Sequence, residues 1–156
     1  MSVRIQVEDF DVGAEVARLR HANPKVGAVA SFVGVVRDLN EGDRVARMTL
    51  EHYPGMTEQA IEAIVAEART RWDIIDVAVV HRVGELKPTD QIVLVVVAAA
   101  HRGEAFAACE FVMDYIKTRA PFWKKEETPQ GSRWVEARAS DDEAADRWTP
   151  PRADVA

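Results

Sequence analysis

The sequence predicts a single α+β domain, with a mainly antiparallel sheet packed against helices. Two predicted strands, 26–36 and 45–53, are separated only by a loop, and two more lie within 74–100. Strands that follow one another without a helix between them favour antiparallel pairing, unlike those of a doubly wound parallel sheet. A chain of 156 residues, 47% hydrophobic and 29% charged, suits one domain with a substantial core. We expect the domain to span residues 1–148 and residues 149–156 to form a loose tail.

The first predicted elements are a strand and a short helix. Val3, Ile5 and Val7 alternate with polar residues, which predicts a strand with one apolar face. Asp11 is a suitable N-cap for a helix that continues to about His21. An Asn-Pro dipeptide then ends the helix.

Two strands and a longer helix follow. Residues 26–36 are rich in Val, Ala and Phe and predict a buried strand, whereas the polar segment 37–44 predicts a loop. Residues 45–53 resume as a strand, which a Pro-Gly pair ends. We expect Thr57 to cap the next helix, whose apolar residues recur at helical spacing as far as Trp72.

Segments 74–83 and 91–100 predict two more strands, and the apolar spacing of 104–119 predicts a second long helix. Pro121 disfavours helical geometry at Ala120, so this helix should end there.

The C-terminal part predicts a hairpin and a last short helix. Segments 122–127 and 133–137 suit two strands joined by the Pro-Gln-Gly turn at 129–131. Ser140 with Glu143 has the capping-box spacing that begins a helix.

Net charge and apolar runs exclude several classes of function. The formal net charge is -6, so the whole chain has no general attraction for nucleic acid or for an anionic membrane. The longest apolar run, 92–100, is far shorter than the roughly 20 residues that cross a bilayer. The first residues, MSVRIQVEDF, lack the apolar run of a secretory signal. We expect a cytoplasmic protein.

Cys109 is the single cysteine, which excludes a disulfide within the chain and argues against a cysteine-based zinc site. It shares a helical apolar stripe with Val112 and Ile116, so we expect a small core residue. Any sulfur that the protein handles should therefore be carried by another molecule.

The remaining histidines and glycines predict neither a metal site nor a cofactor. His21, His52 and His81 lack metal-ligand spacing, and a structural role within a strand would account for His81. The chain contains no P-loop, dinucleotide-binding or GxSxG motif.

The strongest local signal is the segment KTRAPFWKK at 117–125, where four cations fall in nine residues without an acid. Lys117 follows the apolar stripe, so its stem can pack on the core while its ammonium reaches a pocket rim. Cations at a helix end also complement the helix dipole, which suffices for Arg119. That alternative does not explain Lys124 and Lys125, which lie beyond the helix. The sequence therefore predicts an anion-binding pocket.

Two weaker signals are basic residues at strand ends. His101 and Arg102 follow an apolar strand, and an arginine can bind phosphate through two hydrogen bonds. Gly34 lies inside a strand, where a glycine lets a ligand or another backbone approach, and Arg37 begins the next loop. For His101 and Arg102 alone, an ordinary basic turn is the better explanation, and the glycine strand with Arg37 is also a weak signal alone.

Together these segments resemble one family. The matching segments are FVGVVR at 32–37, LEHYPGM at 50–56, HRVGEL at 81–86, AHR at 100–102, and MDYIKTRAPFWKKE with RWVEAR within 113–138. In order and spacing they resemble the large catalytic subunit of molybdopterin synthase, the MoaE family, from about residue 3 to about residue 148.

The resemblance implies a fold, a reaction and partners. The family has an α/β-hammerhead type of α+β domain, and it converts cyclic pyranopterin monophosphate (precursor Z) to molybdopterin by inserting two sulfurs as a dithiolene. The sulfur donor is a small ubiquitin-like subunit, whose C-terminal Gly-Gly thiocarboxylate enters the pocket of the large subunit. Two large subunits form a central dimer within a heterotetramer.

The resemblance also implies site residues. Lys117 and Lys124 match the two catalytic pocket lysines, and His101 and Arg102 match a phosphate-binding pair from the neighbouring subunit. The other implied substrate-binding positions are Phe32, Val35, Val36, Arg37, Met113, Lys125, Glu126 and Arg138. The apolar Val35 is a mild departure from the family pattern.

The chemistry implied by the resemblance suits these residues. Holding a cyclic phosphate beside an anionic thiocarboxylate requires several fixed cations. Neighbouring cations favour the neutral form of a lysine, which suits proton exchange. We therefore expect Lys117 to act as acid and base, while Lys124 and the arginines hold the anions.

Two other functions use the same residue types. A phosphoester hydrolase would also need the cations, but the sequence has no metal cluster and no clear nucleophile-base pair. A non-catalytic module could bind an acidic peptide tail without forming a product. The residues alone leave both alternatives open, and the resemblance argues against both.

Overall fold

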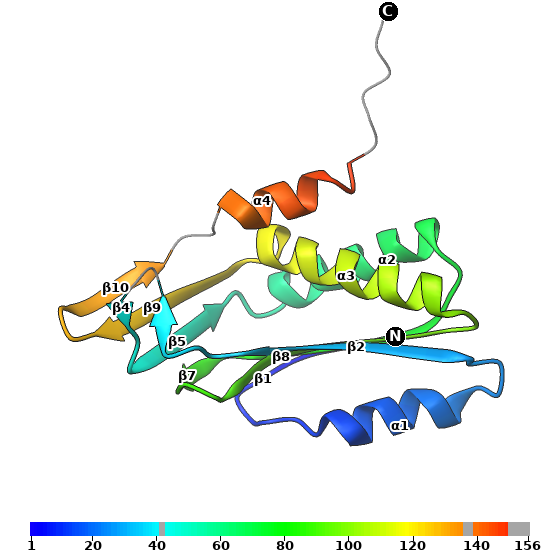
Figure 1. Cartoon of the computed structure of the whole chain (residues 1–156), viewed down its shortest axis with the longest axis horizontal. Helices are drawn as coiled ribbons and strands as arrows, with labels where there is room; N and C mark the ends of the chain where they lie inside the picture. The colour runs from blue at the N-terminus through cyan, green and yellow to red at the C-terminus, as the bar shows by residue number, and fades with distance from the viewer. Residues whose placement is uncertain (41–42, 136–138, 150–156) are drawn as a thin grey trace, which may run out of the picture.

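The computed structural model describes residues 1–40, 43–135 and 139–149, which form two four-stranded sheets, a two-stranded hairpin and four helices (Figure 1). The larger sheet, called here the core sheet, contains in spatial order β1 (Ser2–Gln6), β6 (Ile74–Arg82), β8 (Gln91–Ala99) and β2 (Ala28–Val35). β1 pairs parallel with β6, and the other two pairs are antiparallel. The predicted α+β class with a mainly antiparallel arrangement is confirmed.

Buried apolar side chains cover both faces of the core sheet. Along β8, Val93, Val95 and Val97 belong to the main core cluster, and Leu94 and Val96 belong to a second cluster. Successive side chains of a strand point to opposite faces, so a strand covered on both faces is apolar throughout. This double burial explains the uninterrupted apolar run of β8.

Helices cover the two faces unequally. α1 (Val12–Ala22) lies on one face, and α2 (Met56–Arg71) and α3 (Arg102–Arg119) lie on the other (Figure 1). α4 (Ala139–Asp146) packs against α3. None of the helices in the described ranges combines the length and apolarity needed to cross a bilayer.

The second sheet, called here the end sheet, lies at one end of the core sheet (Figure 1). It contains β10 (Gly131–Val135), β9 (Phe122–Thr128), β5 (Arg47–His52) and β7 (Gly84–Leu86), all antiparallel. The predicted hairpin of β9 and β10 is confirmed. β7 falls in a segment predicted as a connection, and β3 (Leu39–Asn40) and β4 (Asp43–Arg44) pair within the predicted loop.

Two helix ends confirm their sequence signals. Asp11 caps α1, because its carboxylate accepts a 3.0 Å hydrogen bond from the backbone N–H of Ala14. α3 ends at Arg119, and Ala120 is extended with φ -80° and ψ 129°, as a residue before proline prefers.

The predicted cap of α2 is wrong. The helix begins at Met56, and its cap is Gly55, whose φ of 84° favours glycine. Thr57 is fully buried instead. Its hydroxyl donates to the carbonyl of Pro121 at 3.1 Å, and it accepts from the N–H of Tyr53. Thr57 therefore ties the start of α2 to the segment that leads into β9.

The last predicted features fall partly beyond the described residues. α4 begins at Ala139, one residue before the predicted cap Ser140. Residues 150–156 lie outside the described ranges, so the domain boundary at 148 stays a prediction.

Candidate active site

A pocket of about 250 Å³ lies where the core sheet meets the end sheet. It draws residues from β2, β5, β6, β8, β9 and β10 and from the segments of α3 and α4 nearest to it. Its charged and histidine lining residues are Arg37, His81, Lys117, Lys124, Glu126 and Asp141. Three cations from three separate segments thus face one cavity.

Lys117 reaches the pocket from the last turn of α3. The preceding residue, Ile116, is 3% exposed in the core, whereas Lys117 is exposed and lines the pocket. Ala120 and Phe122 extend the lining where the chain turns from α3 into β9. The predicted position of Lys117 at the edge of the apolar stripe is confirmed.

The alternation of β9 separates the neighbouring lysines. Phe122, Lys124 and Glu126 line the pocket, as expected for residues two apart in a strand, and Trp123 between them also contributes to the lining. Lys125 is exposed and is not a lining residue, and its ammonium lies 5.9 Å from the ring centroid of Trp134. The substrate-binding role implied for Lys125 stays a prediction.

Glu126 puts a carboxylate among the cations. It is 4% exposed, and its Oε1 lies 3.6 Å from a guanidinium nitrogen of Arg133 on β10. A buried carboxylate is stable only when it is paired. This pairing leaves the pocket positively charged on balance.

The end of β2 brings Val35, Val36 and Arg37 to the pocket. The pairing register shifts between Gly34 and Val35, and such a bulge turns the following side chains. A Cβ on Gly34 would come within 2.7 Å of a methyl carbon of Val93. The glycine therefore makes room for a side chain of the neighbouring strand, rather than for a ligand or a backbone.

Besides Asp141, His81 is a pocket residue that sequence reasoning missed. It is 6% exposed near the end of β6, and its ring stacks on Phe122 with centroids 3.8 Å apart. The pKa of His81 is lowered from 6.5 to about 4, mainly by burial and also by the electrostatic effect of Lys117 and His52, while the hydrogen bond to the Arg82 backbone opposes this shift. A polar residue directly after the apolar run 77–80 of the strand was the available signal.

His101 and Arg102 lie at the opposite end of α3 from the pocket. Both are exposed, and the rise of the helix separates Arg102 from Lys117 by about 22 Å. They therefore cannot reach the pocket of their own chain.

Two other predicted residues, Phe32 and Met113, do not line the described pocket, and the outcome for a third is open. Phe32 is 41% exposed on β2, which is an edge strand, and Met113 is 7% exposed within the main core. Arg138 lies outside the described residues.

The single cysteine is buried, and the metal-ligating side-chain types do not cluster in the described ranges. Cys109 is 6% exposed in the core, and burial raises the pKa of its thiol to about 12, as expected for an inert core residue. Within the described ranges, no three His, Cys, Asp or Glu side chains converge as a metal site would require.

Comparison with known proteins gives consistent matches. Residues 5–119 match the family model of the MoaE protein. The molybdopterin synthase catalytic subunit of Ralstonia nicotianae is 63% identical over 147 residues, which are 94% of this chain and 84% of that protein.

Solved structures of molybdopterin biosynthesis proteins are also similar to this chain. The molybdopterin biosynthesis MoaE protein from Burkholderia ambifaria is 66% identical with a TM-score of 0.82, over 94% of this chain and 97% of that one. A chain in a complex of subunits 1 and 2 of molybdopterin-converting factor from Helicobacter pylori shares the fold alone. The sequence identity is 18% and the TM-score 0.68, over 88% of this chain and 90% of that one. The chain therefore belongs to the MoaE family, whose named relatives are molybdopterin synthase catalytic subunits.

Proposed function

We propose that this chain acts as the catalytic subunit of a molybdopterin synthase in molybdenum cofactor biosynthesis. In this proposal, it transfers sulfur to a cyclic pyranopterin monophosphate in the pocket around Lys117. The observation that carries this proposal is the convergence of Arg37, Lys117 and Lys124 on one cavity. These cations come from three segments of a packed framework. Fixed positive charges of this kind stabilise anions without having to reorganise during the reaction.

The sulfur donor must be another molecule. The single thiol of the chain, that of Cys109, is buried and resists ionisation. We propose that a small ubiquitin-like partner supplies sulfur through a C-terminal Gly-Gly thiocarboxylate that enters the pocket. The two-subunit complex described for the Helicobacter pylori relative supports such a partnership.

The pocket of one chain is small for two anionic reactants. Its volume of about 250 Å³ is below the range of roughly 300–1,000 Å³ typical of ligand sites. We propose that a second copy of the chain completes the site with His101 and Arg102, which are exposed and unable to reach their own pocket. A homodimer within a heterotetramer would provide this arrangement.

Within the pocket, the residues have different tasks. Lys117 is the acid and base of the sulfur transfer, and Lys124 and Arg37 hold the phosphate and the thiocarboxylate. Glu126, held by Arg133, limits the positive charge that these cations place together. We expect the reaction to take place in the cytoplasm, where reduced sulfur carriers persist.

Reconstitution tests the function. The purified chain, a thiocarboxylated small subunit and cyclic pyranopterin monophosphate should together form a dithiolene product, measured by chromatography and mass spectrometry. The control is the same small subunit with an ordinary C-terminal carboxylate, which should give no product. Turnover of the cyclic precursor without any thiocarboxylate would instead identify a hydrolase, and binding of the small subunit without product would identify a non-catalytic module.

A further inference from the structure

The imidazole of His81 is held in one orientation at the wall of the pocket. One face stacks on Phe122 at an interplanar angle of 19°. Its Nδ1 lies 2.8 Å from the backbone carbonyl oxygen of Arg82. The ring is thus restrained by both a stacking contact and a hydrogen bond.

This hydrogen bond determines which ring nitrogen carries the proton. A carbonyl oxygen only accepts, so Nδ1 must be the donor, and in a neutral imidazole Nε2 is then an acceptor. The pKa of about 4 keeps the ring neutral around pH 7, because burial and the charges of Lys117 and His52 oppose protonation. Nε2 therefore remains an acceptor at the pH of the cell.

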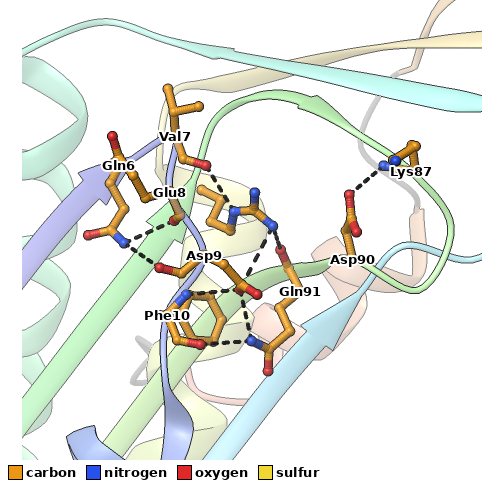
Figure 2. Close-up of polar contacts among 9 residues, drawn as sticks. Gln6, Val7, Glu8, Asp9, Phe10, Lys87, Asp90 and Gln91 are labelled. Atoms are coloured by element: carbon orange, nitrogen blue, oxygen red, sulfur yellow. Dashed lines mark hydrogen bonds and ion pairs between the residues drawn. The ribbon is translucent and has the colours of Figure 1, made fainter.

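The side chain of Arg82 is itself well anchored (Figure 2). The Arg82 guanidinium donates to the carbonyl oxygens of Val7 and Gln91, each at 3.1 Å, and lies 3.8 Å from the carboxylate of Asp9. The Gln91 amide donates to the same carboxylate at 2.9 Å. These contacts join the ends of β1, β6 and β8, so the backbone that orients His81 belongs to the rigid part of the fold.

Nε2 opens onto the pocket without a partner in the described part of the chain. None of the hydrogen bonds found among the described residues involves this atom, and Lys117 does not donate to it. Every fully buried side-chain nitrogen or oxygen there does have a partner. Nε2 is therefore accessible from the cavity that His81 lines.

An uncharged acceptor has a different task from the cations around it. Arg37, Lys117 and Lys124 offer only donors, which suit phosphate or a thiocarboxylate. Nε2 cannot bind either anion, but it can accept from an N–H or O–H group. The geometry points to His81 Nε2 as a substrate-binding acceptor that takes a hydrogen bond from an N–H or O–H donor of the pyranopterin, an inference that rests on the proposed function.

Two variants separate this role from a purely structural one. His81→Asn keeps an amide donor near the position of Nδ1 for the Arg82 carbonyl but has no acceptor at the position of Nε2. His81→Gln has a longer side chain whose carbonyl oxygen reaches that position. Both variants are uncharged amides, and thermal unfolding of each measures the cost to the fold.

We expect His81→Asn to raise the KM for the pyranopterin about tenfold, as for a buried hydrogen bond left unmade, and His81→Gln to restore it to within about threefold. The KM for the thiocarboxylated partner should be unchanged in both. The inference would be overturned if the two variants changed the KM for the pyranopterin equally, or if neither changed it. It would also be overturned if the KM values for the pyranopterin and for the thiocarboxylated partner rose in parallel.

Direct binding separates this inference from the proposed function. Calorimetry with cyclic pyranopterin monophosphate and the chain alone measures affinity without any sulfur transfer. Weaker binding by His81→Asn than by His81→Gln would support the acceptor even if the wild-type chain formed no dithiolene. Equal affinities of wild type and both variants would overturn it even if the wild type were fully active.

Discussion

The two ends of α3 carry similar residues but have different surroundings. At the C-terminal end, Lys117 joins Lys124 and His81 around a cavity built from both sheets. At the N-terminal end, His101 and Arg102 are exposed and line no part of that cavity. Basic residues alone therefore do not make a site. What distinguishes the C-terminal end is a framework that encloses the cations and holds them in place.

The largest expected effect is at the enclosed end. Lys117→Ala should lower dithiolene formation by about 10²- to 10⁴-fold, the usual contribution of a positioned acid or base. The side chain is exposed, so its removal leaves the buried core intact and thermal unfolding should change little. Lys25→Ala, an exposed lysine in the turn after α1, is the matched control. A folded Lys117→Ala variant with near-normal turnover would remove the proposed acid and base.

A smaller loss is expected at the open end. Arg102→Ala should lower kcat/KM for the pyranopterin about 10- to 100-fold, because charged hydrogen bonds to phosphate contribute about 1.5–3 kcal/mol. Arg20→Ala, at the exposed end of α1, controls for the loss of a surface charge. If both variants kept wild-type kinetics, the open end of α3 would have no part in the site.

The pH dependence of stability tests the burial of His81 at the enclosed end. The pKa of His81 is about 4 in the folded chain and near 6.5 when unfolded, so the unfolded state binds more protons between these values. This contribution to stability is complete above pH 6.5 and is lost as the pH falls; at pH 4 the loss amounts to about 3 kcal/mol.

Urea unfolding at pH 7.5 and pH 4 measures this contribution. Between the two pH values, His81→Gln should lose about 3 kcal/mol less than the wild type. Acidic groups such as Asp9 and Asp76, whose native pKa values are lowered, contribute equally in both proteins. Equal losses for His81→Gln and the wild type would mean that burial does not hold the imidazole neutral.

The smallest effect is expected in the middle of α3. Cys109→Ala should keep dithiolene formation within about twofold of wild type, because a thiol whose pKa is about 12 is neither nucleophile nor sulfur carrier. Iodoacetamide should label Cys109 far faster in urea than in the folded chain, as mass spectrometry can follow. Rapid labelling of the folded protein, or loss of activity in the variant, would contradict an external sulfur source.

Much of the fold could be predicted because local signals agree with the final structure. The Asp11 cap, the end of α3 before Pro121 and the hairpin of β9 and β10 each depend on a few adjacent residues. Thr57 shows where such reasoning fails. Its hydroxyl bonds to Pro121, which is 64 positions away, so tertiary contact replaced the local role that the sequence predicted.

The candidate site could be predicted only in part. Charge clustering located Lys117 and Lys124, but the sequence could not show that the pleat of β9 turns Lys125 away from the cavity. His81 was missed because its environment comes from Phe122 and Arg82 together, and no spacing pattern records it. Residues that only folding brings together cannot be recognised from their positions in the sequence.

The central claim is that the two ends of α3 act together in pairs of chains. Lys117→Ala, which should be nearly inactive, and Arg102→Ala, which should keep at most about a tenth of wild-type kcat/KM, should be mixed, dissociated and reassociated before dithiolene formation is measured. Random pairing makes half of the dimers mixed, and each mixed dimer has one intact site, so we predict recovery to about a quarter of wild-type activity. No recovery, with mixed dimers shown to form by mass spectrometry, would contradict the claim.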